Sequence, residues 1–245
     1  MKIKSIFCMA LLAVAMLCAA GCTKPDDENN DNSGDGGNSD GGSQITYEYV
    51  DLGLPSGTLW ATSNVGAASP EDYGDYFAWG ETQPKEYYDW NNYNYCRGDW
   101  NTLTKYCSNP NYGYNGFTDT LTILQASDDA ATANCGEGWR TPTKDEWEEL
   151  ITCCTQTWII RDGINGKLFV ASNGNSVFLP AAGCQGQHLE EVGSIGYYGS
   201  SSLQTNRPDN AWFLEFDSDH SSMDHPIGWR YYGQPVRPVC SSLKR

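Results

Sequence analysis

A group of side chains that could bind a metal ion lies between residues 217 and 225. This segment holds three aspartates and two histidines, at Asp217, Asp219, His220, Asp224 and His225. Carboxylates and imidazoles bind divalent transition metals, but spacing alone does not place them in one coordination sphere. We therefore interpret the segment as a polar surface hairpin, and we predict neither a metal site nor another cofactor.

A candidate nucleophile and a candidate base also lie close together, at Cys184 and His188. Nucleophilic catalysis by a thiol needs a base that is oriented by a third group. The sequence offers no such group beside this pair. We predict no catalytic residues and expect that the protein is not an enzyme.

The segment from 196 to 232 mixes aromatic side chains with Ser, Asn, Asp and His. This mixture gives a large contact area with adaptable hydrogen bonds, as in antibody binding sites, and aromatic faces beside carboxylates suit sugars. Alternation along a predicted strand at 211–216 places Ala211, Leu214 and Phe216 inward and Trp212, Phe213 and Glu215 outward. The residues predicted to bind a glycan or protein ligand are Phe213, Glu215, Asp219, His220, Ser222, Asp224, His225, Trp229 and Tyr231. Core packing is the alternative for Phe213 and Trp229.

Two helices and many short strands must position these residues. Thr143 and Glu146 form a capping box, and Trp147, Leu150, Ile151 and Cys154 then recur on one helical face. A shorter helix is predicted to begin at Ser127 and to run through Ala133. Predicted strands cover 45–50, 58–62, 158–161, 167–172, 176–179, 196–200, 211–216 and 234–239, with a turn at 163–166. Helices that precede antiparallel strands indicate an α+β fold with long irregular loops, especially over 69–116.

Charge excludes one class of partner. The chain has 31 acidic and 15 basic residues, of which six and three precede residue 45. Residues 45–245 therefore carry 25 acids and 12 bases, a net charge of −13. Because a phosphate backbone would be repelled, we predict no nucleic-acid binding. These residues include seven cysteines, an odd number; Cys96 and Cys107 could close a short loop, but most are expected to be buried thiols.

The amino terminus has the pattern of a lipoprotein. Lys2 and Lys4 precede an apolar run that ends in Ala19-Ala20-Gly21-Cys22, so residues 1–21 are predicted to be a signal peptide and Cys22 the lipid-modified first residue. The alternative is an ordinary signal peptide, with Cys22 incidental. Residues 22–44 are rich in Asp, Asn, Gly and Ser and are expected to form a disordered acidic spacer. Residues 45–245 then form one domain, which meets the membrane only through the lipid.

The order of several motifs resembles a known family. The strings are V-D-L-G-L-P-S-G-T-L-W-A-T-S-N-V-G-A (50–67), E-D-Y-G-D-Y-F-A-W-G-E-T (71–82), G-W-R-T-P-T-K-D-E-W-E-E-L (138–150), F-L-P-A-A-G (178–183) and V-R-P-V (236–239). This series resembles the Fibrobacter succinogenes major paralogous domain, which is similar to the C-type lectin-like superfamily and occurs in surface lipoproteins. The resemblance implies a lectin-like α+β domain whose first and last strands pair. We expect Trp139 and Trp147 to anchor the main helix to the sheet.

The resemblance also frames the expected function. Calcium-dependent sugar binding is not carried over, because Gln83-Pro84-Lys85, Arg207-Pro208-Asp209 and Gln234-Pro235-Val236 are only partial matches to the lectin loop motif. The acids after Lys24 resemble a bacteroidete surface-export signal, which implies the outer face of the outer membrane. The carboxy-terminal position of the aromatic segment resembles the diversified face of retroelement-encoded variable proteins. We expect a surface-displayed, non-enzymatic ligand-binding module; the alternative is a structural subunit of a surface assembly such as a pilus tip.

Overall fold

A four-stranded sheet joins the two ends of the described chain. The computed structural model describes residues 47–224 and 228–241. Strand β14 (Val239–Ser241) pairs with both β2 (Thr58–Ala61) and β4 (Trp139–Arg140), and β1 (Tyr49–Asp51) pairs with β2 at the sheet edge. The expectation that the first and last strands pair is therefore wrong for β1. Gly57 N–H donates to the Leu54 carbonyl oxygen at 2.9 Å and closes a tight turn between β1 and β2. This turn makes β1 and β2 a hairpin, so β1 pairs with β2 and not with β14.

The main helix follows the sequence prediction. Helix α2 spans Lys144–Cys153, and both hydrogen bonds of its Thr143–Glu146 capping box are present. Trp147 and Leu150 are fully buried, and the Trp147 indole packs against Trp60 of β2 with ring centroids 4.8 Å apart. Trp147 thus anchors the helix to the sheet as expected. Trp139 does not, because it lies in β4 and packs against Tyr47 at 5.9 Å.

The shorter helix begins later than predicted. Helix α1 spans Ala130–Cys135, and its N-cap is Asp129, whose carboxylate accepts from Ala131 N–H and Thr132 N–H. Residues 126–128, which include the predicted cap Ser127, form a 3-10 turn instead. The Asp129 carboxylate is buried and also accepts hydrogen bonds from the backbone N–H and the hydroxyl of Thr141, 12 residues along the chain. These bonds hold the side chain in the position from which it caps the helix.

Three strands after α2 form a meander. Strand β5 (Thr155–Arg161) pairs with β6 (Ile164–Val170), and β6 pairs with β7 (Ser176–Pro180). The turn is Asp162-Gly163 rather than 163–166, because both residues have positive φ, 48° and 85°. That conformation suits a two-residue hairpin turn, which leaves Ile164 free to begin the next strand.

A second three-stranded sheet carries most of the predicted binding segment. Strand β10 (Gly196–Leu203) pairs with β11 (Ala211–Phe216), and β11 with β12 (Ser221–Ser222). Two smaller pairs join β3 (Tyr76–Phe77) to β13 (Gln234–Pro235) and β8 (Cys184–Gln185) to β9 (Leu189–Glu190). The strand predicted at 234–239 is thus two strands in two sheets. Pro238 has no N–H for a continuous ladder, and Arg237 between them is fully buried.

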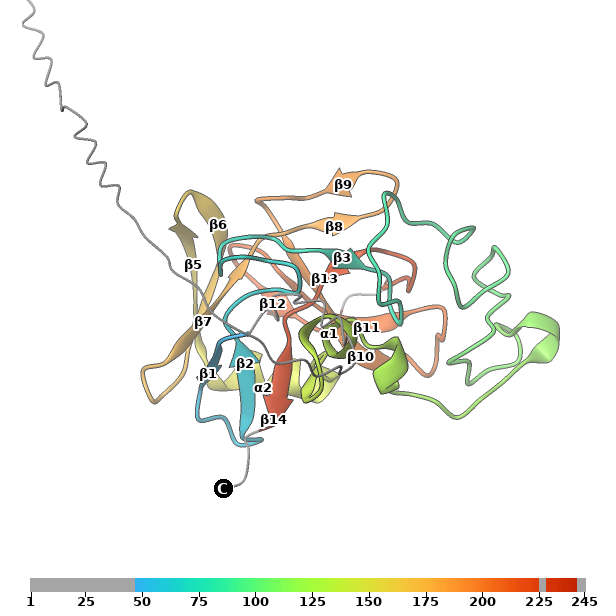
Figure 1. Ribbon diagram of the computed structural model, residues 1–245, viewed down its shortest axis with the longest axis horizontal. Coiled ribbons are helices and arrows are strands. Elements are labelled where there is room, and N and C mark those ends of the chain that lie inside the picture. Colours follow the sequence, from blue (N-terminus) through green and yellow to red (C-terminus); the bar gives the residue numbers. More distant parts are fainter. Residues whose placement is uncertain (1–46, 225–227, 242–245) are drawn as a thin grey trace, which may run out of the picture. The chain divides into compact units, whose positions relative to one another are not determined.

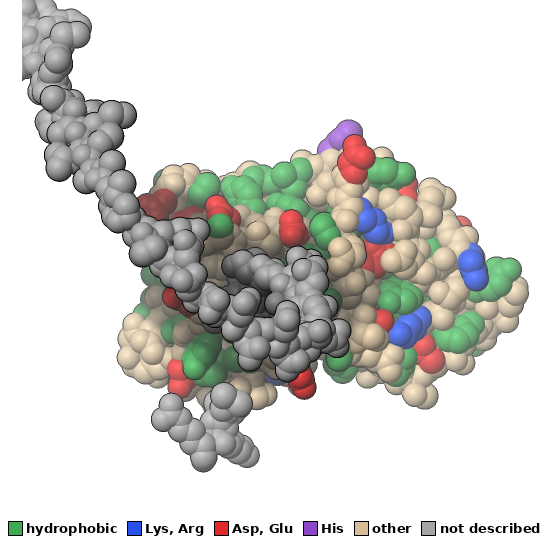
Figure 2. All heavy atoms as spheres, viewed as in Figure 1, with side chains coloured by type: hydrophobic (Ala, Val, Ile, Leu, Met, Phe, Trp, Pro, Cys, Tyr) green, Lys and Arg blue, Asp and Glu red, His purple; other side chains and the backbone are tan. Residues whose placement is uncertain are grey.

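Residues 80–125 form a long irregular segment, drawn as green loops in Figure 1. Its strand-like contacts are isolated bridges, from Cys96 to Leu103 and from Leu103 to Gly113, and a short 3-10 turn covers Tyr114–Gly116. Aromatic side chains fill this segment in place of regular structure, as the sequence predicted. In Figure 2, hydrophobic side chains emerge among mostly uncharged surface at the end of the molecule that this segment forms.

These elements establish the α+β class. Among the described residues the two α-helices are accompanied by antiparallel strands in small sheets, and all belong to one compact unit. Over the same residues no helix has the length and apolar character needed to cross a membrane. The seven cysteines of this part are all free thiols, so Cys96 and Cys107 are not bonded to each other, and four of the seven are buried. The predicted signal peptide, Cys22 and the spacer lie outside the described residues.

Candidate functional site

A cleft of about 270 Å³ lies where three distant segments meet. We call it the aromatic cleft. It is lined by Trp90, Trp100, Tyr112, Arg207, Asp209 and Trp229. The first three belong to the irregular segment, Arg207 and Asp209 to the turn between β10 and β11, and Trp229 to the approach to β13. Ligand pockets are typically apolar clefts that contain a few polar groups, and this lining has that composition.

The aromatic walls are braced by further rings. The Trp100 ring meets Tyr112 edge-on at 5.4 Å. Trp229 stacks on Tyr231 at 5.7 Å, and Tyr231 meets the edge of Trp90 at 5.0 Å. Trp100 is 44% exposed. Because rings in such arrays support one another's orientation, the indoles of the cleft present fixed apolar faces to a ligand.

One ion pair supplies the polar part of the cleft. Arg207 Nη2 lies 3.1 Å from Asp209 Oδ2; the Arg207 side chain is 47% exposed, whereas that of Asp209 is 3% exposed. The hydrogen bond to Asp209 raises the pKa of Arg207 above its ordinary value. The second carboxylate oxygen of Asp209, Oδ1, is buried without a hydrogen-bond partner among the described residues. The cleft therefore contains a charged pair with one unsatisfied acceptor.

Arg230 connects the irregular segment to the turn that bears the ion pair. Its fully buried guanidinium donates to the carbonyl oxygens of Lys105 (3.1 Å), Tyr106 (3.0 Å) and Pro208 (2.9 Å), and to the Tyr93 hydroxyl at 2.8 Å. The guanidinium also lies 4.7 Å from the centre of the Trp79 ring. Since Arg230 follows Trp229 directly, these contacts hold in place the backbone that carries the Trp229 indole.

Asn210 and Gly228 fix the same segment from its other side. The Asn210 side-chain oxygen accepts from Gly228 N–H at 2.7 Å, and Asn210 forms a bridge with Trp229. A Cβ at Gly228 would lie 2.5 Å from the Ala211 carbonyl oxygen and 2.7 Å from the Phe213 ring. Only glycine allows the chain to pass this close to β11, so the local sequence determines where Trp229 enters the cleft.

The structure brings together only part of the predicted binding set. Trp229 lines the aromatic cleft, and Tyr231 supports it from behind. Both are half-buried. His225 lies outside the described residues.

The outward orientation predicted for Phe213 is wrong. Its side chain is only 3% exposed. Strand β11 is the middle strand of its sheet, and the Gly228 segment and Tyr197, whose ring lies 5.9 Å away, cover the Phe213 face. Glu215 on the same strand is half-buried. Simple alternation fails here because both faces of the strand are covered, as the burial of Ala211, Leu214 and Phe216 also shows.

The acidic hairpin lies apart from the lining of the cleft. Asp219, His220, Ser222 and Asp224 are all exposed, as predicted, but none lines the cleft. Ligand atoms of Asp217, Asp219 and His220 lie within 4.8 Å of one another. One Asp217 oxygen, however, accepts from the backbone N–H groups of both Asp219 and His220 at 2.7 Å. This is the turn chemistry of a polar surface hairpin.

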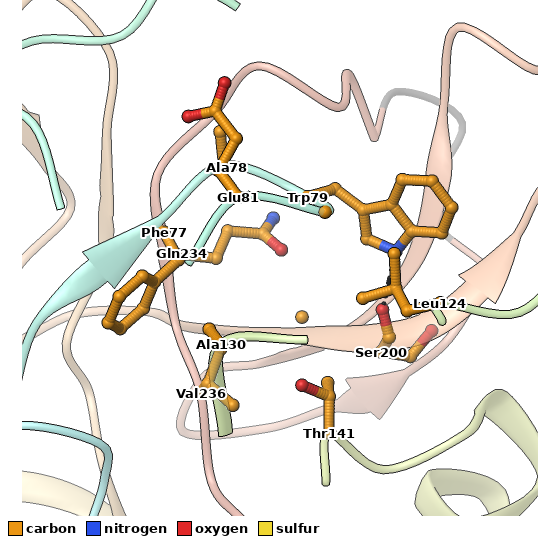
Figure 3. A pocket seen from close by; sticks show the side chains of 12 residues that line it. Phe77, Ala78, Trp79, Glu81, Leu124, Ala130, Thr141, Ser200, Gln234 and Val236 are labelled. Carbon is orange, nitrogen blue, oxygen red and sulfur yellow. Dashed lines mark hydrogen bonds between the residues drawn. The ribbon is translucent and has the colours of Figure 1, made fainter. Parts of the chain in front are cut away.

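Two other cavities are less suited to a ligand of this kind. The cavity in Figure 3 lies between Trp79, Leu124, Thr141 and Gln234, and the Glu81 carboxylate points away from it. Its volume of about 20 Å³ is comparable to the space that one water molecule needs.

A third cavity, of about 200 Å³, is lined in part by Cys184, Glu190, Tyr197 and Phe213. Burial, together with the nearby glutamates, raises the pKa of the Cys184 thiol to about 12. The thiol is therefore protonated at neutral pH, and His188, the base considered for it, is exposed.

Sequence reasoning missed most of the aromatic cleft. The sequence places Trp90, Trp100 and Tyr112 only within the long loops expected over 69–116, and Arg207 and Asp209 only within a partial match to the calcium-dependent lectin motif. The one sequence feature that points to this part of the cleft is the high density of aromatic residues over 87–114. No protein-family model matches the sequence, and neither a curated protein nor a solved structure matches the chain.

Proposed function

We propose that this protein is a non-enzymatic binding protein of the cell surface, which takes a glycan in the aromatic cleft. The observation that carries the proposal is the combination in one cleft of three indoles, one phenol ring and an arginine–aspartate pair. Sugars present C–H faces and hydroxyl groups together. Indole faces pack against the C–H faces of a sugar, and carboxylate and guanidinium groups form hydrogen bonds to its hydroxyl groups.

We further propose a lectin-like fold for residues 45–245. The α+β class, the short antiparallel strands and the long irregular segment are compatible with it. The ordered motifs from Val50 to Val239 supply the remaining support, through their resemblance to the Fibrobacter succinogenes major paralogous domain.

The proposed location is the outer membrane, with the domain facing the exterior. The support is the lipobox-like segment that ends at Cys22, followed by an acidic spacer. Palmitate or a similar acyl group on Cys22 would anchor the chain, and the membrane would be contacted only through that lipid. A tether of this kind suits a protein whose partner is outside the cell.

The test is binding of the purified full-length protein to glycan and host-protein arrays. We expect binding to glycans, and we expect Trp229→Ala to abolish it while the circular dichroism spectrum shows that the protein is still folded. The matched control is Tyr49→Ala, because Tyr49 is 58% exposed on β1 and does not line the cleft.

The absence of binding on both the glycan array and the host-protein array, together with co-purification of a fixed bacterial partner, would contradict the proposal. That result would instead support a structural subunit of a surface assembly.

A further inference from the structure

Asp209 is a buried carboxylate with incomplete hydrogen bonding. The residue is 2% exposed, and its Oδ2 is paired with Arg207 while its Oδ1 has no hydrogen-bond partner among the described residues. Buried polar groups are nearly always satisfied, and an unsatisfied acceptor is energetically costly. Other buried atoms of the described residues share this property, but among the residues that line the aromatic cleft Asp209 is the one that has it, so a group bound in the cleft can supply the missing donor.

We propose that the Arg207–Asp209 pair sets the charge class of the ligand, so that the cleft selects an uncharged group with two adjacent hydroxyls and binds it without a metal ion. This inference rests on the proposed function and specifies it further. One hydroxyl donates to Asp209, and its neighbour accepts from Arg207, whose guanidinium carries five N–H donors.

Charged ligands fit this pair less well. An anionic sugar would place its carboxylate or sulfate beside Asp209, on a domain with a net charge of −13. A cationic sugar would compete with Arg207, which already neutralises Asp209 at 3.1 Å. A hydroxyl group both donates and accepts, so it completes the hydrogen bonding of the pair without adding charge.

Access to the unsatisfied oxygen requires a rearrangement of the lining. Asp209 Oδ1 is enclosed, so a hydroxyl reaches it only when a neighbouring side chain moves aside. Arg207 has the freedom to move, because nearly half of its side chain is exposed. Asp209 then shares its carboxylate between the guanidinium and the ligand.

The lining cannot hold a hard cation. Calcium takes six to eight oxygen ligands. The side-chain oxygens of the cleft are those of Asp209 and the Tyr112 hydroxyl, and Asp209 is already paired with a cation. Binding through this cleft is therefore metal-independent, unlike the calcium-dependent sugar binding of lectin loops.

The test is calorimetric titration of the purified full-length protein with methyl glycosides of three charge classes. The neutral probes are methyl glucoside, galactoside and mannoside; each has an anionic counterpart, the uronide, and a cationic counterpart, the 2-amino sugar. We expect at least one neutral probe to bind at least ~10-fold more tightly than its charged counterparts, with the same affinity in excess EDTA. We expect Asp209→Asn and Arg207→Gln each to weaken binding by ~10–100-fold, as for the loss of a charge-assisted hydrogen bond.

Asp162→Asn is the matched control, because Asp162 is an exposed aspartate in the β5–β6 turn and asparagine tolerates its positive φ of 48°. If Asp209→Asn does not fold, Arg207→Gln still decides, because nearly half of the Arg207 side chain is exposed. Loss of affinity in EDTA, preference for a charged probe, or unchanged affinity in Arg207→Gln would each overturn the inference. Array binding without binding of any neutral probe would overturn it while leaving the proposed function intact.

Discussion

Replacing Arg230 should both destabilise the domain and disorder the aromatic cleft. Its guanidinium makes four hydrogen bonds, three of them to backbone carbonyl oxygens of Lys105, Tyr106 and Pro208. Hydrogen bonds to a charged group contribute ~1.5–3 kcal/mol each, so four of them give about 6–12 kcal/mol before other effects. Removing a buried cation recovers several kcal/mol of its desolvation cost. For Arg230→Met we therefore expect a net loss of ~3–5 kcal/mol in the free energy of unfolding.

The assay is denaturant unfolding followed by tryptophan fluorescence, with unchanged slope as the criterion that only stability has changed. Arg230→Lys should lose less, because lysine keeps the charge but not the planar array of donors. Arg97→Met serves as the control, since Arg97 is exposed and its loss should cost under about 1 kcal/mol. A loss below about 1 kcal/mol for Arg230→Met would refute the reasoning, because it would mean that the four acceptors find other partners.

Three further predictions concern stability and reactivity. Burial opposes ionisation of Glu146, but hydrogen bonds from Arg140, Thr143 and Thr58 prevail and lower its pKa from 4.5 to about 2. The stabilisation is therefore complete above pH 4.5 and is lost as the pH falls toward 2. It amounts to about 3 kcal/mol, and Glu146→Gln should remove this pH dependence in acid unfolding. Gly228→Ala should lower stability by ~1–3 kcal/mol in thermal unfolding because its Cβ would overlap β11. The control Gly199→Ala meets only Gln234 at 3.5 Å, so an equal effect would contradict the packing argument. Cys153, which is exposed, should react with iodoacetamide at pH 8 well before Cys184, whose pKa is raised by burial; equal labelling in peptide mass spectra would show that the Cys184 thiol is accessible.

The sequence predicted the elements whose signals are local. The capping box at Thr143 and the periodicity through Cys154 located α2, because both depend on residues within a few positions of one another. The hairpin turn at Asp162-Gly163 begins one residue before the predicted turn and ends three residues before it. Its dipeptide is a known turn signal, and only the pairing of Arg161 with Ile164 fixes the register.

The candidate site depends on contacts that no local pattern reveals. Trp229 was found because it lies in an aromatic segment, whereas Trp90, Arg207 and Asp209 come from segments more than 100 residues apart. Phe213 was predicted to face outward because alternation assumes one solvated strand face, and the passage of Gly228 over β11 removes that face. Long-range packing therefore determines which of the predicted polar and aromatic residues share a cleft.

The contacts of Arg230 have a consequence for how this protein could change over evolutionary time. Three of its four hydrogen bonds end on main-chain carbonyls, which every amino acid supplies. The side chains at 105, 106 and 208 do not take part in those bonds, so substitutions there need not break them. The backbone path at these three positions is therefore held by Arg230 whichever side chains stand there, and a change of sequence leaves the three carbonyl acceptors in place.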